Sequence, residues 1–591
     1  MPAHDEPPTI AERLELLRVV PLLATLGSSE LSDLAGDLRV VEVAAGEWLC
    51  REGDPADTAY VVSSGRLEVT RGLPEPQVIR TLRRGAAVGE LALLRRGPRT
   101  ASVRATRDSV LFALARGRFE QLILNAPNFA LSLARAMADQ LAATTAAETP
   151  SVTPRTLTLV ALDDRVDLSL AAQMLVSELD RGTSVAIIDR PAGEQRADWT
   201  VALARAEISH DFVVLAVAAT EPGDPWATFC LGECDLAIAL SGRAIDPRWT
   251  RAVGAIALSG SELVAIDYRV GDDVIGTIAP RQVRAVRGRM GLAAAMREIG
   301  RRVTGRGVGL VLSGGGARAL AHIGVIEGLR DAGITFDRIG GVSQGSIISA
   351  GLARGDSPEQ VYELARYFCD TNPTNDYTLP LAAVIRGRKF ERLLDEVLGD
   401  TLIEELPTPY FCTSTDVVNR EIVVHRTGRL ADAVRASMSV PGLLPPVRDR
   451  SGRVLVDGGV LDNLPIATMA AMGGGPIIAA DVTTADDDPA AATDGRRWAR
   501  APAQVRRLIT GTDAVLPSLG ETIIRCVTLA SSDTVAASRQ HADLVISPEV
   551  SGIGLLDWQR LPEMRTAGIA AVTEALAGAG EIVDRIRTMS A

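Results

Sequence analysis

The chain has 591 residues, 47% of them hydrophobic, and a formal net charge of −12. A chain of this length exceeds a single hydrophobic core, so we expect about three or four domains. The negative charge argues against nucleic acid as a main partner, because phosphate backbones attract proteins with excess positive charge.

Hydropathy, the N-terminal sequence and the cysteine content indicate the cellular compartment of the protein. We find no apolar run of bilayer length and no signal peptide. We therefore expect a soluble cytoplasmic protein, with any membrane contact peripheral and at the inner face of the membrane. The six cysteines are scattered, which favours a reducing compartment over a disulfide framework. Cys230 and Cys234 have no histidine or second cysteine pair nearby, so the sequence predicts core thiols and no metal site.

The N-terminal region combines a helical pattern with a strand pattern. Apolar spacing from Ile10 to Leu38 is helical, and Ser28 with Glu30 gives a helix-start signal. Short alternating strands follow, separated by glycines at the spacing of tight turns. These glycines are Gly46, Gly53, Gly65 and Gly85. The pattern predicts a small antiparallel β-barrel.

One segment of this barrel carries the groups that a cyclic nucleotide requires. A turn of helix that opens at Gly89 and continues through Glu90 and Leu91 would present N–H groups to a phosphate. Arg99 would add a bidentate fork, and Glu90 could accept a hydrogen bond from a sugar hydroxyl. Taken alone, such a glutamate and arginine would more often form a solvated surface ion pair.

The order of features from Leu22 to Leu124 resembles the cyclic-nucleotide-binding domain family. The resemblance implies that Glu90 meets the ribose hydroxyl and Arg99 the cyclic phosphate. Thr100 sits where a threonine could contact a guanine base, which leaves cAMP and cGMP both open as an allosteric ligand. The alternative is a degenerate sensor domain that only packs.

A linker and an α/β region follow the barrel. Alanine-rich helical sequence runs from Arg116 to about Thr145, and Glu148 to Pro154 reads as a linker. From Thr156 to about Tyr268, apolar runs alternate with helical segments, which predicts a parallel sheet. The runs are Leu157–Leu162, Val185–Asp189, Phe212–Val217, Leu236–Leu240 and Leu263–Asp267.

This middle region lacks the motifs of a nucleotide-binding sheet. It has no phosphate loop, and its first strand runs into Asp163 and Asp164, whose carboxylates would repel phosphate. We therefore predict a structural or interaction domain. The basic segment from Arg284 to Gly305 is predicted to be helical and to link this domain to the catalytic part.

Two glycine motifs organise the C-terminal region. The apolar run Val308–Leu312 predicts a buried strand, and it is broken by Gly314, Gly315 and Gly316 before a helix. Three successive glycines let N–H groups converge at the positive end of the helix, which makes an anion site. Further on, Gly341, Ser343 and Gly345 form a G-x-S-x-G turn that exposes a serine hydroxyl on a sharp elbow.

A serine hydroxyl needs a base before it acts as a nucleophile. None of the three histidines of this region lies in a motif that a Ser-His-Asp triad predicts, and His322 is expected to pack or to bond the backbone. Asp457 is the better candidate, because it ends an apolar strand before Gly458 and Gly459 and burial would raise its proton affinity. The plainer alternative is an aspartate that caps a turn.

Four motifs in one order resemble the patatin-like phospholipase family, in the branch akin to neuropathy target esterase, where cyclic-nucleotide domains precede the lipase. The resemblance implies an α/β/α fold with Ser343 as nucleophile, Asp457 as base and the Gly314 to Gly316 backbone as oxyanion hole. Arg318 would hold that loop or an anionic headgroup, and no metal is required. The motifs are Gly314–Arg318, Gly341–Gly345, Arg435–Gly442 and Asp457–Gly459 with Asn463 and Pro465.

The sequence therefore predicts a multidomain α/β protein of three parts. These are a cyclic-nucleotide-binding domain with flanking helices at 1–148, a parallel α/β middle domain at 155–304, and a patatin-like domain at 305–591 with its core at 306–482. The expected function is a serine esterase that hydrolyses carboxylic ester bonds of phospholipids or lysophospholipids under the control of a cyclic nucleotide. The alternative is a cyclic-nucleotide sensor or scaffold with a weakly active or inactive patatin domain.

Substrate contacts are less sharply predicted. Apolar stretches near Tyr377–Ile385 and Val440–Pro446 are candidates for an acyl groove or a membrane-facing rim, although core packing explains them equally well. Arg386, Arg388 and Lys389 could meet phosphate headgroups or simply start a solvated helix. Gln344 occupies a position in the elbow where small residues are more usual, and we expect it to alter rate or substrate size without abolishing activity.

Overall fold

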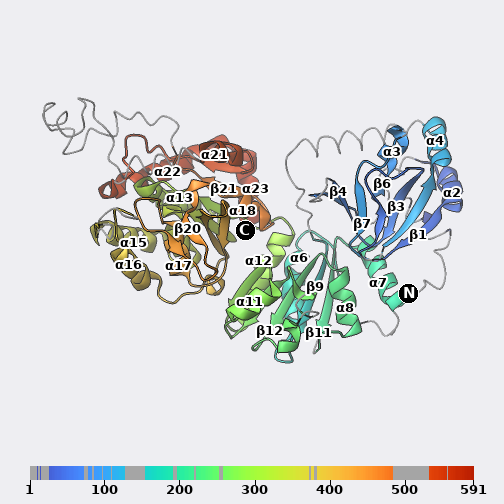
Figure 1. Ribbon diagram of the computed structural model, residues 1–591, viewed down its shortest axis with the longest axis horizontal. Helices are drawn as coiled ribbons and strands as arrows, with labels where there is room; N and C mark the ends of the chain where they lie inside the picture. Colours follow the sequence, from blue (N-terminus) through green and yellow to red (C-terminus); the bar gives the residue numbers. More distant parts are fainter. Residues whose placement is uncertain are drawn as a thin grey trace. The chain divides into compact units, whose positions relative to one another are not determined.

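The computed structural model describes three stretches of the chain and a few isolated positions outside them. The stretches are residues 26–126 apart from 45, 72–76, 83–85, 96 and 108; residues 154–483 apart from 191–195, 219–220, 252–253, 255–256, 372–374 and 379–382; and residues 531–590 apart from 556. Figure 1 labels the helices and strands of the chain, which divides into two compact units. One comprises Met1–Thr156, Ile188–Val213 and Thr228–Asp235, and the other comprises Leu157–Ile187, Val214–Ala227 and Leu236–Ala591.

The N-terminal region contains two antiparallel four-stranded sheets, as the alternating pattern predicted. One has the order β1-β8-β3-β6 and the other β2-β7-β4-β5, and Val62, Leu67, Leu82 and Leu111 are buried in a shared cluster. Three of the predicted turn glycines adopt positive φ, whereas Gly85 lies outside the described residues. The strands are β1 Arg39–Val43, β2 Trp48–Cys50, β3 Thr58–Ser64, β4 Leu67–Arg71, β5 Gln77–Leu82, β6 Ala87–Val88, β7 Ser102–Ala105 and β8 Ser109–Ala115.

Helices flank these sheets. Helix α2 spans Ser28–Asp37, and the side chain of Glu30 accepts a hydrogen bond of 2.8 Å from the N–H of Gly27, which confirms the predicted helix start. Helix α3 spans Glu90–Arg95 and helix α4 spans Arg116–Asn125. The rest of the predicted alanine-rich helix and most of the predicted linker lie outside the described residues.

The middle sheet has six strands in the order β10-β11-β9-β12-β13-β14. Each of the five predicted apolar runs coincides with a strand, and the pairs β9-β12, β12-β13 and β13-β14 are parallel. The strands are β9 Thr156–Ala161, β10 Val185–Ile188, β11 Phe212–Ala218, β12 Leu236–Ser241, β13 Glu262–Ile266 and β14 Gln282–Val286. The helices are α6 Leu168–Leu179, α7 Arg196–Ser209, α8 Pro225–Glu233, α9 Pro247–Thr250, α11 Asp272–Ile278 and α12 Gly288–Val303.

The predicted helix from Arg284 to Gly305 was wrong at its start. Residues Arg284–Val286 belong to β14, which pairs with β13 along its whole length, and α12 begins only at Gly288. Strand β13 overrides the helical pattern of the local sequence, because it supplies backbone hydrogen bonds to the segment that contains Val283 and Val286.

Asp163 performs a structural task at the end of the first middle strand. Its carboxylate accepts hydrogen bonds from the Ser241 hydroxyl at 2.9 Å, from the Gly242 N–H at 2.8 Å and from the Arg165 N–H at 2.9 Å. These bonds tie the carboxyl ends of β9 and β12 together. A cavity of about 220 Å³ lies beside them, and it is lined by Leu162, Asp163, Asp164, Glu221, Ser241, Arg243, Ala244, Asp246 and Arg248.

The C-terminal region is built on an eight-stranded mixed sheet of order β19-β20-β17-β16-β15-β21-β22, with β18 paired to β17. Strands β17, β16, β15, β21 and β22 are parallel, whereas β18, β19 and β20 run antiparallel to their partners. The strands are β15 Gly309–Leu312, β16 Arg338–Val342, β17 Tyr410–Asp416, β18 Glu421–His425, β19 Val447–Arg448, β20 Val454–Asp457, β21 Ile477–Ala480 and β22 Leu544–Ile546.

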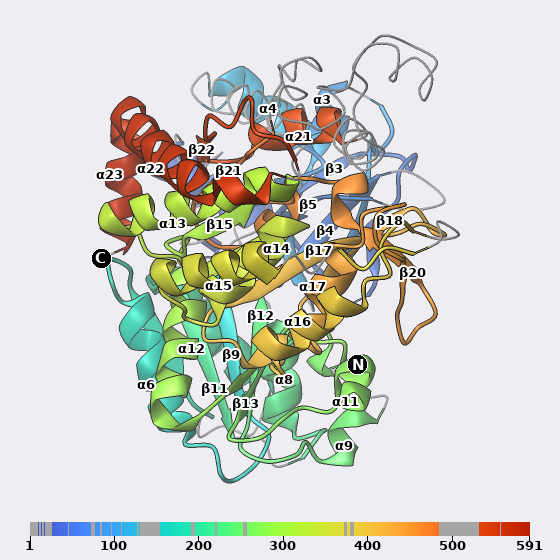
Figure 2. The ribbon, with the colours of Figure 1, turned by 90° about the vertical axis from the view of Figure 1, so that its left-hand side faces the viewer.

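Helices cover both faces of this sheet, as the α/β/α expectation requires. Leu310 and Leu312 of β15 point into one buried cluster and Val311 into another, because successive strand residues face opposite sides. Helices α13 and α22 lie side by side in Figure 2 and contact each other. The helices are α13 Ala321–Asp331, α14 Gln344–Ala353, α15 Pro358–Thr371, α16 Arg388–Leu398, α17 Leu430–Ser437, α18 Ile466–Ala471, α21 Ser532–Arg539, α22 Leu561–Gly578 and α23 Gly580–Ser590.

Within the described stretches, no single helix has both the length and the hydropathy of a membrane span. Of the helices that the structure describes, only the pair Trp558–Gly578 and Gly580–Met589, bent by 106°, reaches those values jointly.

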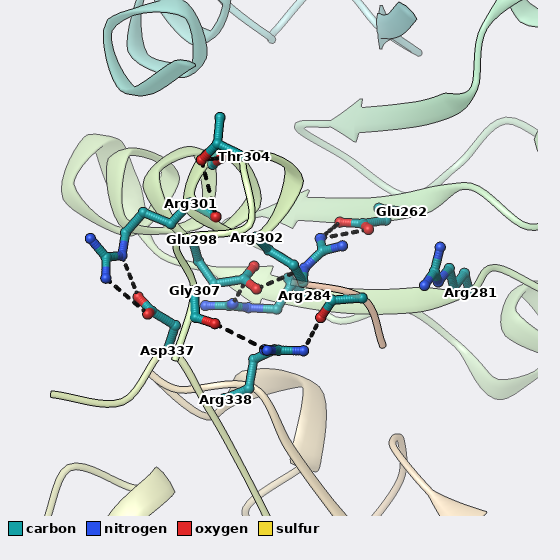
Figure 3. Close-up of polar contacts among 12 residues, drawn as sticks. Glu262, Arg281, Arg284, Glu298, Arg301, Arg302, Thr304, Gly307, Asp337 and Arg338 are labelled. Atoms are coloured by element: carbon teal, nitrogen blue, oxygen red, sulfur yellow. Dashed lines mark hydrogen bonds and ion pairs between the residues drawn. The ribbon is translucent and has the colours of Figure 1, made fainter. Parts of the chain in front are cut away.

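A buried ionic cluster joins α12 to β13 and to the segments that lead into β15 and β16 (Figure 3). Arg302 of α12 donates to Glu262 of β13 at 2.5 Å and to Glu298 at 3.0 Å, and all three side chains are buried. Arg301 pairs with Asp337 at 2.7 Å, and Asp337 also accepts from the Val308 N–H at 2.7 Å. The helix is thereby tied to the entrances of β15 and β16, the strands that lead to the two glycine motifs.

Replacing Arg302 by alanine is expected to lower the free energy of unfolding by about 3–5 kcal/mol, because it leaves Glu262 and Glu298 buried without their main partner. Urea denaturation measures the loss. The matched control is Arg366→Ala, which removes an exposed pair with Glu363 and should change stability by no more than about 1 kcal/mol. Equal losses in the two variants would contradict a structural role for the cluster.

Candidate functional site

The serine elbow has the strained geometry of an exposed nucleophile. Ser343 lies between β16 and α14 with φ 52° and ψ −129°. Residues other than glycine rarely adopt this backbone conformation, and strained residues of this kind cluster at functional sites. A Cβ on Gly341 would come within 2.6 Å of the Gly345 carbonyl oxygen, and a Cβ on Gly345 within 2.6 Å of the Leu312 carbonyl oxygen. Both glycines of the motif are therefore required for close backbone packing.

Asp457 lies next to the serine in a buried position. Its Oδ1 accepts from the Gly459 N–H at 2.8 Å, which is the turn-capping role, and its side chain is 1% exposed. Burial raises the pKa of Asp457 to about 6, while the nearby Ser343 hydroxyl and the Gly459 N–H act to lower it. Oδ2 is also buried, and it has no hydrogen-bond partner of good geometry among the described residues. One carboxylate oxygen caps the turn, and the other remains available to take a proton.

The C-terminal end of α17 holds both of these residues. The Ser343 N–H donates to Ser437 Oγ at 3.0 Å, and the Asp457 N–H donates to the Ser439 carbonyl at 2.9 Å. Arg435 in turn donates to Ser439 Oγ at 2.6 Å. The sequence marked Arg435–Gly442 as a motif but predicted no function for it. The two serines on either side of Met438, just before a proline, were the sequence feature that could have indicated this supporting role.

The glycine loop packs directly against the elbow. A Cβ on Gly314 would lie 3.0 Å from Ser343 Cβ and 2.4 Å from Asn463 Oδ1. The Gly314 N–H makes a long bond of 3.3 Å to the Asn463 carbonyl, and Asn463 Nδ2 donates to the Gly314 carbonyl at 3.3 Å. Among the described residues, no backbone carbonyl accepts from the N–H of Gly315 or Gly316. These two N–H groups are therefore the candidate donors to an oxyanion.

Arg318 and the segment after β22 hold the other side of this loop. Arg318 is buried and its Nε donates to the Ile553 carbonyl at 2.7 Å. The Ala317 N–H donates to the Leu555 carbonyl at 2.9 Å, and a Cβ on Gly316 would come within 2.3 Å of the same oxygen. The guanidinium therefore braces the loop through Ile553, one of the two roles that the sequence suggested for it.

Two histidines of this region, His322 and His425, are buried structural groups. His322 Nε2 donates to the Ser313 carbonyl at 2.9 Å, and burial lowers the pKa of His322 to about 4. His425 Nε2 lies 2.7 Å from Ser414 Oγ, and burial lowers the pKa of His425 to about 4 as well. His541 follows α21. The backbone bond of His322 agrees with the plain role expected from the sequence.

The predicted acyl-groove segments lie side by side. The Val384 N–H donates to the Gly442 carbonyl at 2.9 Å and the Ile385 N–H to the Leu443 carbonyl at 3.0 Å. Tyr377 is exposed, and residues 379–382 lie outside the described part. Arg386 precedes α16, which begins at Arg388, and Lys389 Nζ donates to Asn375 Oδ1 at 2.6 Å. An apolar cavity of about 40 Å³ opens elsewhere, between α14, α15 and α16.

The N-terminal region brings its predicted site residues together. Gly89 has φ +90°, α3 begins at Glu90, and both Glu90 and Arg99 are buried. Arg99 Nη2 donates to the Thr58 carbonyl at 2.8 Å and Nη1 to the Gly89 carbonyl at 3.4 Å, with the guanidinium 5.5 Å from the Tyr60 ring centre. Leu91 lies in α3 and Thr100 directly follows Arg99.

The charge of Arg99 points to an anion as the missing partner. Its acceptors within the described residues are backbone carbonyls, and its Nε is buried without a partner there. A buried guanidinium is normally paired with a negative group. The remaining N–H donors of Arg99 therefore suit a phosphate.

No group of three or more histidine, cysteine or acidic side chains is arranged to hold a metal ion within the described stretches.

Comparisons with known proteins cover nearly the whole chain. The patatin-like phospholipase family matches residues 310–470, and the cyclic nucleotide-binding domain matches residues 40–126. The chain is 33% identical to an uncharacterized NTE family protein of Mycobacterium tuberculosis, covering 96% of this chain and 97% of that protein. It is 25% identical to a lysophospholipase of Aspergillus fumigatus, covering 95% of this chain and 43% of that protein. The two family matches contain Ser343 with Asp457 and the Arg99 segment, respectively.

Proposed function

Because the chain belongs to the NTE family and carries both a cyclic nucleotide-binding domain and a patatin-like phospholipase domain, we propose that it hydrolyses carboxylic ester bonds of phospholipids or lysophospholipids. In this proposal Ser343 is the nucleophile and Asp457 the base. The observation that carries it is the strained Ser343 beside a buried carboxyl whose pKa is raised to about 6. The lysophospholipase of Aspergillus fumigatus supports the choice of lipid.

The acylation half of the reaction follows from this arrangement. Asp457 accepts the proton of the Ser343 hydroxyl while the serine oxygen attacks the ester carbonyl carbon. The carbonyl electron pair moves onto its oxygen, and the N–H groups of Gly315 and Gly316 stabilise the oxyanion. The C–O bond to the alcohol then breaks as the carbonyl re-forms, and Asp457 returns its proton to the leaving alcohol.

Deacylation repeats these steps with water. Asp457 takes a proton from water as the water oxygen attacks the acyl carbon, the same N–H groups stabilise the second oxyanion, and the bond to Ser343 breaks. Asp457 gives the proton to Ser343, which restores the free site and releases the fatty acid. A lipid substrate also implies peripheral contact of the protein with a membrane surface.

Regulation by a cyclic nucleotide is the second part of the proposal. Arg99 and the backbone at Gly89 would bind the cyclic phosphate of cAMP or cGMP, and Glu90 would meet the ribose. Coupling between two sites typically changes an affinity by about 5- to 150-fold. Hydrolysis of a lysophospholipid, measured with and without each nucleotide, tests both parts. No hydrolysis under either condition would favour the alternative, a nucleotide sensor with an inactive patatin domain.

Replacing Arg99 by leucine is expected to weaken cyclic nucleotide binding by about 10- to 100-fold, because charge-assisted hydrogen bonds to the phosphate are lost. Isothermal titration calorimetry measures the dissociation constant. Arg95→Leu is the matched control, since Arg95 is an exposed arginine at the end of the neighbouring helix α3. This variant should bind the nucleotide with an affinity near that of the wild type. Unchanged affinity in Arg99→Leu would rule out this phosphate site.

A further inference from the structure

The apolar cavity next to the elbow begins at one face of α14. Gln344, Ile347, Ile348 and Gly351 line it at helical spacing, so the helix that starts at the nucleophile also forms the cavity wall. Helices α15 and α16 complete the wall with apolar side chains. These are Val361, Leu364, Ala365, Phe368, Leu393, Leu394, Val397 and Leu398.

Two polar side chains line this cavity, and they differ in their bonding. Arg354 at one end donates to Asp356 and to the Val397 carbonyl, so its guanidinium is already bound. Gln344 is 3% exposed, and its Oε1 is buried without a partner among the described residues. A buried amide oxygen without a donor destabilises the site until a ligand supplies one.

We propose that the cavity takes the acyl chain of the ester and that Gln344 selects acyl groups with a hydroxyl close to the carbonyl. The inference rests on the proposed function, because the ester carbonyl must sit at Ser343. Gln344 directly follows Ser343, so its amide can reach only the first few carbons of the chain. The cavity volume of about 40 Å³ holds about three water-sized spheres, which fits a short chain or the first part of a longer one.

The physical basis of this selectivity is the difference between two ester substrates. A hydroxyacyl group gives its O–H to the Gln344 oxygen and satisfies it. A plain acyl group fills the cavity and supplies no donor, so the buried oxygen stays unsatisfied. Sites built around a substrate hydroxyl reject the analogue that lacks it. We expect the hydroxyacyl ester to have a kcat/KM about 10- to 100-fold higher.

The test compares 4-nitrophenyl 3-hydroxybutyrate with 4-nitrophenyl butyrate on the full chain, after subtraction of the rate of Ser343→Ala. Wild type should prefer the hydroxy ester, and Gln344→Leu, of similar size but apolar, should lose or reverse that preference. Leu393→Ala is the matched control, because it enlarges the same cavity without changing a polar group and should keep the preference. Thermal melting should show Gln344→Leu at least as stable as wild type.

A second substrate pair separates the acyl side from the alcohol side. With 2-hydroxyethyl butyrate and ethyl butyrate, the wild type and Gln344→Leu should show the same ratio of rates. The inference is overturned if wild type hydrolyses both nitrophenyl esters with equal kcat/KM, or if only the alcohol-side pair responds to Gln344→Leu. If wild type hydrolyses none of the four esters and no lysophospholipid, the proposed function fails as well.

Discussion

Replacing Ser343 by alanine should reduce ester hydrolysis by about 10⁴-fold or more, because no other group can form the acyl-enzyme once the nucleophile is gone. Ser343 is half-buried and directly follows β16. The measurement is kcat/KM for a nitrophenyl ester and for a lysophospholipid. Binding of cyclic nucleotide should be unaffected.

Ser349→Ala is the matched control for that loss. Ser349 lies in the same helix α14, and its hydroxyl donates to the Ser346 carbonyl at 3.0 Å inside the helix. Its removal should change the rate by only a few-fold, because no reacting atom is touched. Substantial activity in Ser343→Ala would assign the hydrolysis to another residue.

Replacing Asp457 by asparagine should lower kcat by about 10²- to 10⁴-fold and at the same time stabilise the protein. Activity falls because an amide cannot take the serine proton, and general base catalysis contributes about that factor. The Gly459 N–H can still donate to the amide oxygen, so the turn that Asp457 caps should survive. The measurements are kcat and the free energy of unfolding at pH 7.

The gain in stability follows from the direction of the pKa shift. The pKa of Asp457 is raised from 3.8 to about 6 by burial, so the folded state holds the proton more tightly than the unfolded state. Stability is therefore lost as pH rises from about 4 to about 6, and the full loss remains above pH 6. A shift of this size corresponds to about 3 kcal/mol as an upper bound. Asparagine removes that penalty.

The same pKa sets the pH dependence of the wild-type rate. The base must be ionised to accept a proton, so kcat/KM should rise as pH passes through about 6 and level off above it. A rate that is independent of pH between 5 and 7, or an Asp457→Asn variant that is less stable than wild type at pH 7, would contradict the role of this carboxyl.

The local geometry of the site could be predicted from sequence because residue type alone determines it. Only glycine permits the close contacts at Gly341 and Gly345, so the elbow is visible as a spacing of glycines around Ser343. Asp457 was visible because it ends an apolar strand before two glycines. Both motifs describe backbone turns, and turns depend on a few neighbouring residues.

Contacts between segments far apart in the chain could not be predicted from a single sequence. Ser437, Ser439 and Asn463 form hydrogen bonds to Ser343, Asp457 and Gly314, respectively, across separations that no local pattern encodes. The cavity above α14 depends on how α15 and α16 pack, and its apolar residues look like any core. The start of α12 was wrong for the same reason, since β14 exists only because β13 lies beside it.

The most direct test of the account is covalent labelling of the full chain with a fluorophosphonate, followed by mass spectrometry of the modified peptide. The account predicts one label on Ser343 in the wild type, no label in Ser343→Ala, and much slower labelling in Asp457→Asn. An unlabelled wild type, or a label on any other serine, would contradict the assignment of Ser343 and Asp457 as the catalytic pair.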